Sequence, residues 1–204
     1  MSNIIFISGT PCVGKTTIAE ILSQRLNCDL IKINDFAISN DLVLGIDDEK
    51  GYKIIDIENL DILLNKTIKN HNFLIVEGHL AHLCSGADKV FILRCRPEIL
   101  KERLNGRNYS ESKIHENLED EALGICSAEA LELYDENIFE LDVSDFSVDE
   151  SVSVLFDVVN GDEKLSFGDV DFMDWFVNKS DWFLVVFKFL TKRLILELFK
   201  TNIW

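Results

Sequence analysis

A short segment near the N-terminus has the residue types and spacing of a phosphate-binding loop. Residues 9–17 read GTPCVGKTT and match the pattern G-x-x-x-x-G-K-[ST]. Glycines in such a loop let backbone N–H groups turn toward an anion, and the N-terminus of the next helix adds positive charge. Lys15 would reach the β- and γ-phosphates of a nucleotide, and the Thr16 hydroxyl would bind Mg²⁺. The alternative is a glycine-containing turn with a surface lysine.

The segments on either side of this loop favour the phosphate-binding interpretation. Residues 4–7 form an apolar run typical of a buried strand, and residues 18–26 place apolar side chains at helical spacing. Strand, loop and helix form the context in which this motif binds phosphate. The residues predicted to hold the donor phosphates are Cys12, Val13, Gly14, Lys15, Thr16 and Thr17.

Polar residues also follow two other apolar runs that are typical of strands. Asn34 and Asp35 come after residues 29–33, and could contact a second substrate because loops after parallel strands lie at the ligand edge of a sheet. Asp35 could equally cap a helix.

A carboxylate and two histidines follow the apolar run 73–76. Glu77 is the candidate for orienting Mg²⁺ or its waters, and His79 for positioning a water or contacting phosphates. His82 favours a packing role or the start of a helix, since a zinc site would need a third ligand.

Two arginines suggest a lid. Pro97 suits the first turn of a helix that carries Arg103 and leads to Arg107 in a glycine-containing loop. The planar guanidinium binds phosphate oxygens bidentately, so both residues could close over a transferring phosphoryl group. Arg103 could instead pair with Glu98 or Glu102 on its own helix.

The remaining pattern predicts an α/β fold of one main domain. Residues 90–93 and 138–143 give the fourth and fifth strands, a long helix is predicted over 113–134, and a closing helix over 148–159. Five strands alternating with helices predict a parallel sheet covered on both faces. The five cysteines form no C-x-x-C pair and no signal peptide precedes the loop, which predicts a reducing, cytoplasmic location.

The charge is strongly negative and unevenly distributed. The net charge is −16, and residues 109–174 contain 20 acidic residues against Lys113 and Lys164. Phosphates would be repelled from such a segment, which excludes a general nucleic-acid surface. The segment could bind a basic protein or simply be a solvated acidic surface.

Several motifs together resemble the adenylate kinase isoenzyme six family in its archaeal form. They are GTPCVGKTT at 9–17, KIND at 32–35, VEGHLAH at 76–82, LRCRP at 93–97, ERL at 102–104 and RNY at 107–109. The resemblance implies a three-layer P-loop nucleoside-monophosphate-kinase fold over residues 1–180, with an AMP-binding region near 30–53 and a lid near 106–116. It implies Mg²⁺-dependent transfer from ATP to AMP, giving two ADP, together with ATPase activity and small ribosomal subunit maturation through a basic ribosomal protein.

Two features depart from that family. Cys12 stands where the family's loop usually has glycine, which would cost roughly 1 to 3 kcal/mol if its φ is positive. The alternative is that the loop adjusts with little loss. Residues 181–204 form an additional apolar and basic segment, predicted as an amphipathic extension that docks on the protein itself or on a second copy, with a membrane surface as the alternative. The alternatives to an adenylate kinase are an ATPase switch or scaffold in ribosome assembly, and a kinase for another small acceptor.

Overall fold

The computed structural model describes residues 3–47, 51–107, 109–134 and 137–177. The predicted extension 181–204 lies outside the described residues. No helix within the described part of the chain is long and apolar enough to span a bilayer.

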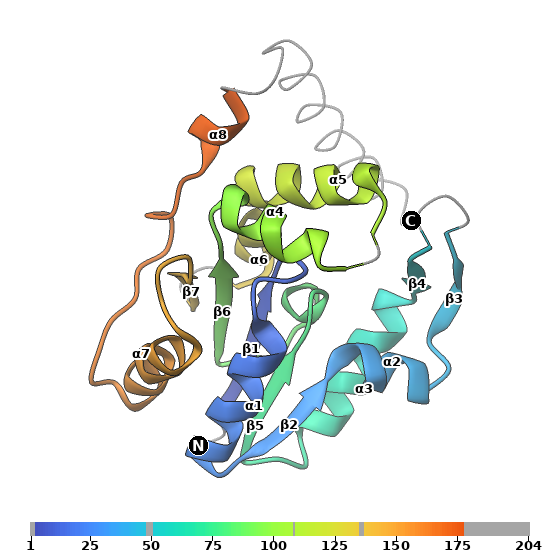
Figure 1. Cartoon of the computed structure of the whole chain (residues 1–204). Coiled ribbons are helices and arrows are strands. Elements are labelled where there is room, and N and C mark those ends of the chain that lie inside the picture. The colour runs from blue at the N-terminus through green and yellow to red at the C-terminus, as the bar shows by residue number, and fades with distance from the viewer. Residues whose placement is uncertain (1–2, 48–50, 108, 135–136, 178–204) are drawn as a thin grey trace.

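A five-stranded parallel sheet forms the centre of the fold (Figure 1). All five predicted strands are confirmed, and their spatial order is β2-β5-β1-β6-β7. Apolar side chains of β1 alternate between two cores: Ile5 and Ile7 face one, and Ile4 and Phe6 face the other. The strands are β1 Asn3–Gly9, β2 Asp29–Lys32, β5 Phe73–Glu77, β6 Lys89–Arg94 and β7 Ile138–Asp142.

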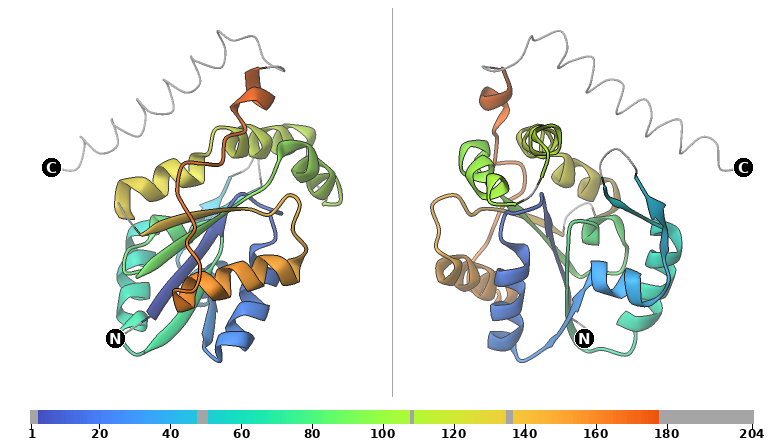
Figure 2. Two further views of the ribbon diagram at one scale, coloured as in Figure 1. Left: turned by 90° about the vertical axis from the view of Figure 1, so that its left-hand side faces the viewer. Right: turned by 45° about the vertical axis from the view of Figure 1, so that its right-hand side comes forward.

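Helices cover both faces of the sheet, which makes the fold three-layered (Figures 1 and 2). On one face pack α1 Lys15–Leu26, α4 Pro97–Asn105, α5 Glu111–Ala122 and α7 Val148–Asn160. On the other pack α2 Ile33–Ser39, α3 Ile57–Ile68, the 3-10 turn η1 Ala81–Leu83 and α6 Ile125–Tyr134. Because both faces are covered, the central strands β1, β5 and β6 are apolar runs rather than alternating ones.

The predicted long helix over 113–134 is wrong, because the chain forms α5 and α6 with a break between them. Gly124 has a φ of 63°, in the left-handed region that a continuous right-handed helix cannot include. A Cβ at this position would lie 3.4 Å from Nη1 of Arg94, so the turn also passes close to a buried guanidinium.

The region after β2 differs from the prediction in two ways. Helix α2 begins at Ile33 with Lys32 as its N-cap, so Asp35 lies in the first turn and the alternative N-cap role for Asp35 is wrong. An antiparallel hairpin, β3 Val43–Ile46 and β4 Lys53–Ile55, follows where no strand was predicted. Its strands are too short to show a clear hydrophobic period.

The chain after α7 returns along the edge of the sheet. The N–H of Glu140 in β7 donates to the carbonyl of Ser166 at 3.0 Å. The short helix α8, Met173–Val177, then places Phe176, 1% exposed, against Ala122 of α5. The described C-terminal residues therefore belong to the same folded unit as the sheet.

Candidate nucleotide-binding site

The phosphate-loop motif lies between the end of β1 and the start of α1, as predicted. Gly9, with a φ of 135°, must be glycine because a Cβ there would lie 2.3 Å from the carbonyl oxygen of Leu93. Gly14, with a φ of 113°, is the N-cap of α1. Val13 is 1% exposed and anchors the loop in the core.

Three cationic side chains line one pocket at this loop. The pocket has a volume of about 290 Å³ and is lined by Cys12, Gly14, Lys15, Thr16, Thr17, Arg103 and Arg107. Arg103 lies in the last turn of α4 and Arg107 just beyond it. The Nη1 of Arg103 donates to the carbonyl of Val13 at 3.1 Å rather than to an acid of its own helix. The two arginines and the loop are thus brought together, which is the charge arrangement of a polyanion site.

Lys15 is held inside the loop. Its ammonium donates to the carbonyls of Gly9 and Thr10, both at 2.8 Å, and the residue is 8% exposed. Burial lowers the pKa of Lys15, whereas Cys126 and the carboxylates of Glu77 and Glu121 act in the opposite direction. A phosphate in the pocket would supply charged oxygens to this ammonium.

Thr16 and Glu77 place two hard oxygen donors side by side. The Thr16 hydroxyl lies 3.3 Å from Oε1 and 3.2 Å from Oε2 of Glu77, which ends β5. Burial raises the pKa of Glu77, and nearby Lys15 opposes that shift. A hydroxyl and a carboxylate at the edge of a phosphate loop are ligands that suit Mg²⁺, so these residues fit the ion.

His79 is a neutral acceptor. Its Nδ1 lies 3.1 Å from the carbonyl of Gly9, and because a carbonyl only accepts, Nδ1 carries the proton and Nε2 the free lone pair. Burial lowers the pKa of His79 to about 4, so the ring is neutral near pH 7. This state suits the predicted positioning of a water better than binding of a phosphate.

His82 occupies the packing role expected for it. It is 1% exposed, with Nδ1 2.6 Å from the hydroxyl of Ser8 and Nε2 2.9 Å from the carboxylate of Glu129. The ring therefore joins β1, η1 and α6.

A second pocket, of about 410 Å³, lies beside α2. Its lining residues are Leu30, Ile31, Lys32, Asp35, Phe36 and Ser39. Asp35 therefore faces this pocket, whereas Asn34 is an exposed residue of α2.

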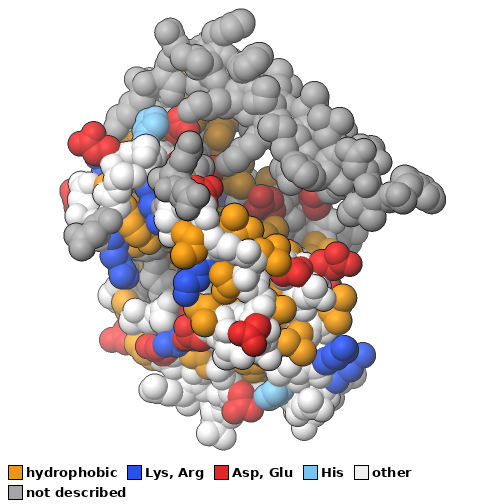
Figure 3. Space-filling model, turned by 90° about the vertical axis from the view of Figure 1, so that its right-hand side faces the viewer, with side chains coloured by type: hydrophobic (Ala, Val, Ile, Leu, Met, Phe, Trp, Pro, Cys, Tyr) orange, Lys and Arg blue, Asp and Glu red, His pale blue; other side chains and the backbone are white. Residues whose placement is uncertain are grey.

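Figure 3 looks onto the side of the molecule formed by α2, α3 and the hairpin, where hydrophobic side chains gather. The exposed ones include Ile38, Leu44, Ile46, Ile54 and Ile62.

The fold and this loop define a P-loop protein, and solved structures agree. Shikimate kinase from Acinetobacter baumannii aligns with a TM-score of 0.58 at 14% identity, over 80% of this chain and 96% of that one. Thymidylate kinase from Candida albicans aligns with a TM-score of 0.51 at 16% identity, over 81% and 97%. At these identities the likeness establishes the fold.

The sequence comparisons define the family. Residues 5–124 match the AAA domain family. A protein of Methanothermobacter thermautotrophicus named "Putative adenylate kinase" is 41% identical over 172 residues, which are 84% of this chain and 98% of the relative. A Pyrococcus furiosus protein of the same name is 37% identical, over 82% and 90%. The chain belongs to this adenylate-kinase-like family.

The structure also joins Thr10 of the loop to two distant residues, Arg94 and Glu121, whose connection the sequence does not show. Arg94, Thr10 and Glu121 form a contiguous set of polar contacts although up to 111 positions separate them. One signal was present: Glu121 lies on the same helical stripe as the apolar Leu118 and Ala122, where a carboxylate needs a buried partner.

Proposed function

We propose that this protein is an adenylate kinase that reversibly transfers the γ-phosphoryl group of ATP to AMP, giving two ADP. The observation that carries the proposal is the single pocket in which Arg103 and Arg107 meet Lys15 and the phosphate loop. The family supports it, because relatives that are 41% and 37% identical carry adenylate kinase in their names.

Each residue has a role in this proposal that follows from its place. The loop from Cys12 to Thr17 holds the donor phosphates through backbone N–H groups, and Lys15 neutralises the β- and γ-oxygens. Thr16 and Glu77 would hold Mg²⁺, which when bound neutralises charge on the same oxygens. Arg103 and Arg107 stabilise the transferring group.

The acceptor side is proposed around α2. An oxygen of the AMP phosphate attacks the γ-phosphorus while the bond to the β-phosphate oxygen breaks and ADP leaves. This oxygen is already anionic, so positioning rather than a strong general base is required. Asn34 and Asp35 are proposed to contact AMP within residues 30–53, and residues 106–116 to act as the lid of a kinase domain that spans 1–180.

A second activity, hydrolysis of ATP, is favoured by His79. Its neutral ring has a free acceptor at Nε2, which can orient a water in place of AMP.

We also propose a basic ribosomal protein of the small subunit as a partner in maturation of that subunit. The acidic segment 109–174 supports this through charge complementarity.

A coupled assay with ATP and a panel of nucleoside monophosphates tests the kinase proposal. We expect AMP-dependent formation of ADP, and a fall of at least about 100-fold in turnover for Lys15→Ala and for Arg107→Ala, because each removes charge stabilisation from the transferring group. Lys101→Ala, an exposed lysine of α4 outside the pocket lining, is the matched control and should behave as wild type.

The same assay separates the alternatives. Phosphate release from ATP that is unaffected by AMP would instead establish an ATPase, and a different preferred acceptor would establish another small-molecule kinase. Wild-type rates in Lys15→Ala or Arg107→Ala would contradict the assigned roles.

A further inference from the structure

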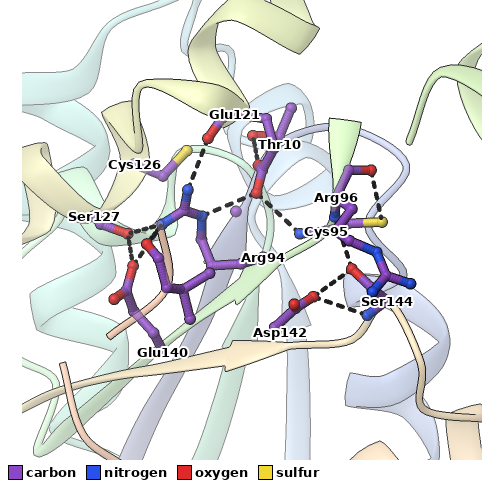
Figure 4. A network of polar contacts seen from close by, with 12 residues as sticks. Thr10, Arg94, Cys95, Arg96, Glu121, Cys126, Ser127, Glu140, Asp142 and Ser144 are labelled. Carbon is purple, nitrogen blue, oxygen red and sulfur yellow. Dashed lines mark hydrogen bonds and ion pairs between the residues drawn. The ribbon is translucent and has the colours of Figure 1, made fainter. Parts of the chain in front are cut away.

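A buried ion-pair network lies next to the phosphate loop (Figure 4). Arg94, the last residue of β6, is 3% exposed and lies between Glu121 of α5, 1% exposed, and Glu140 of β7, 5% exposed. Its Nε is 2.9 Å from Oε1 of Glu121, and its Nη1 is 2.7 Å from Oε1 of Glu140. Burying three charges is costly unless each is paired and hydrogen-bonded, so their partners define what the network holds in place.

Glu121 connects this network to the loop. Its Oε1 also accepts from the N–H of Cys95 at 2.9 Å, and its Oε2 accepts from the hydroxyl of Thr10. Arg94 donates in addition to the backbone carbonyl of Glu121 at 2.7 Å. Both carboxylate oxygens and the carbonyl of this residue therefore accept from residues at the end of β6 or in the loop.

Thr10 passes this restraint to Lys15. Thr10 is 2% exposed, directly follows Gly9, and its carbonyl is one of the two that accept from the Lys15 ammonium. The backbone hydrogen bond from the N–H of Val13 to the carbonyl of Thr10 is long, at 3.4 Å. The charge-assisted hydrogen bond from the Thr10 hydroxyl to Glu121 is therefore the stronger restraint on the position of Thr10.

Glu140 provides an internal comparison. It shares Arg94 and is similarly buried, but its carboxylate accepts in addition from the hydroxyl of Ser127 at 2.5 Å and from the N–H of Gly168 at 2.8 Å. These partners belong to α6 and to the C-terminal segment. The two carboxylates thus contribute comparably to the buried ion pair, and of the two Glu121 is the one bonded to the phosphate loop.

We infer that Glu121 is a positioning residue for nucleotide binding: held by Arg94, it fixes Thr10 and so sets the loop carbonyls that present Lys15 to the phosphates. The inference rests on the proposed binding of ATP by this loop and is independent of the acceptor. It also assigns a task to α5, whose N-terminal end lies in the proposed lid and whose C-terminal end carries Glu121.

Four variants of the full chain test this inference, with mant-ATP as the titrated probe. Thr10→Val keeps the side-chain volume and removes the hydroxyl, whereas Thr10→Ser keeps the hydroxyl. Glu121→Gln and Glu140→Gln each remove one carboxylate charge from Arg94. For each variant the Kd for mant-ATP, the Tm and, where the chain is active, the KM for ATP and for AMP are measured.

We expect Thr10→Val and Glu121→Gln to weaken mant-ATP binding by about tenfold or more, because the first removes the hydroxyl that donates to Glu121 and the second removes the charge from that hydrogen bond. Thr10→Ser should stay within about threefold of wild type. Glu140→Gln should lower the Tm about as much as Glu121→Gln but leave the Kd within about threefold. The KM for ATP should follow the Kd, and the KM for AMP should not.

Wild-type affinity in both Thr10→Val and Glu121→Gln would overturn the inference, as would equal weakening by Glu140→Gln, which would show a general effect of destabilisation. If Glu121→Gln does not fold, the comparison of Thr10→Val with Thr10→Ser decides. The proposed kinase activity is tested separately. It would be contradicted if a wild-type chain that binds mant-ATP showed no AMP-dependent formation of ADP.

Discussion

Cys12 occupies a backbone conformation that favours glycine. Its φ is 71°, in the left-handed region, where a Cβ approaches the backbone too closely. The positive φ on which the predicted strain depends is therefore present, whereas the strain itself stays a prediction. Lys15, Thr16 and the glycines of the loop could be placed at the pocket from the sequence because the strand, loop and helix that position them are consecutive in the chain, and Cys12 could be identified as unusual for the same reason.

Comparison of Cys12→Gly with Cys12→Ala measures this strain. Both variants lose the thiol, but only glycine relieves the positive φ, so Cys12→Gly should be more stable to unfolding by about 1 kcal/mol, measured by urea denaturation. Gln24 is an exposed residue of α1 and serves as the control. There the order should be reversed, with Gln24→Ala more stable to unfolding than Gln24→Gly by about 0.5 to 1 kcal/mol. Equal stabilities at Cys12 would exclude stored strain.

At the scale of elements, the parallel sheet could be predicted from the sequence, whereas the hairpin β3–β4 and the break between α5 and α6 could not. The three central strands β1, β5 and β6 are apolar runs buried on both faces, which makes them visible in the sequence. The strands of the hairpin β3–β4 are too short to show a hydrophobic period, and the break between α5 and α6 lies at Gly124, which passes close to Arg94 only in the fold. Glu121 and Thr10 are likewise joined only by the fold.

Lys113 of α5 connects the proposed lid to the hairpin. Its ammonium lies 3.8 Å from the ring centroid of Tyr52, just before β4, and 4.2 Å from that of Tyr109, just before α5. All three residues are partly buried, so each cation–π contact is worth about 0.5 to 2 kcal/mol. The two contacts share one cation, so its loss should loosen both elements together.

Lys113→Met keeps the aliphatic stem and removes the charge. We expect amide hydrogen exchange to become about three- to tenfold faster both in residues 109–112 and in residues 51–55, as measured by mass spectrometry. Lys66→Met, an exposed lysine of α3, should leave both segments unchanged. Acceleration in one segment alone would show that Lys113 does not couple them.

At the scale of the whole molecule, the C-terminal residues up to 177 complete the core rather than trail from it. The segment pairs with β7 through Ser166 and Glu140, Phe172 lies over the Arg94 guanidinium at 5.3 Å, and Phe176 fills a site on α5. The sequence placed the domain boundary near 180, which stays a prediction. The periodicity alone ended the last helix at about 159 and could not show this return along the sheet.

Substitution of Phe176 tests whether the segment after α7 contributes to the stability of the fold. In the full chain, Phe176→Ala should lower the free energy of unfolding by about 3 to 5 kcal/mol, because it opens a cavity at a side chain that is 1% exposed. Val177→Ala, one position later and 47% exposed, should cost less than about 0.5 kcal/mol. Both are measured by urea denaturation followed by tryptophan fluorescence and by circular dichroism. The two residues are adjacent in α8, so equal small losses of unfolding free energy in both variants would mean that the C-terminal segment does not contribute to the core. A much larger loss in Phe176→Ala would mean that this segment unfolds in the same cooperative unit as the sheet.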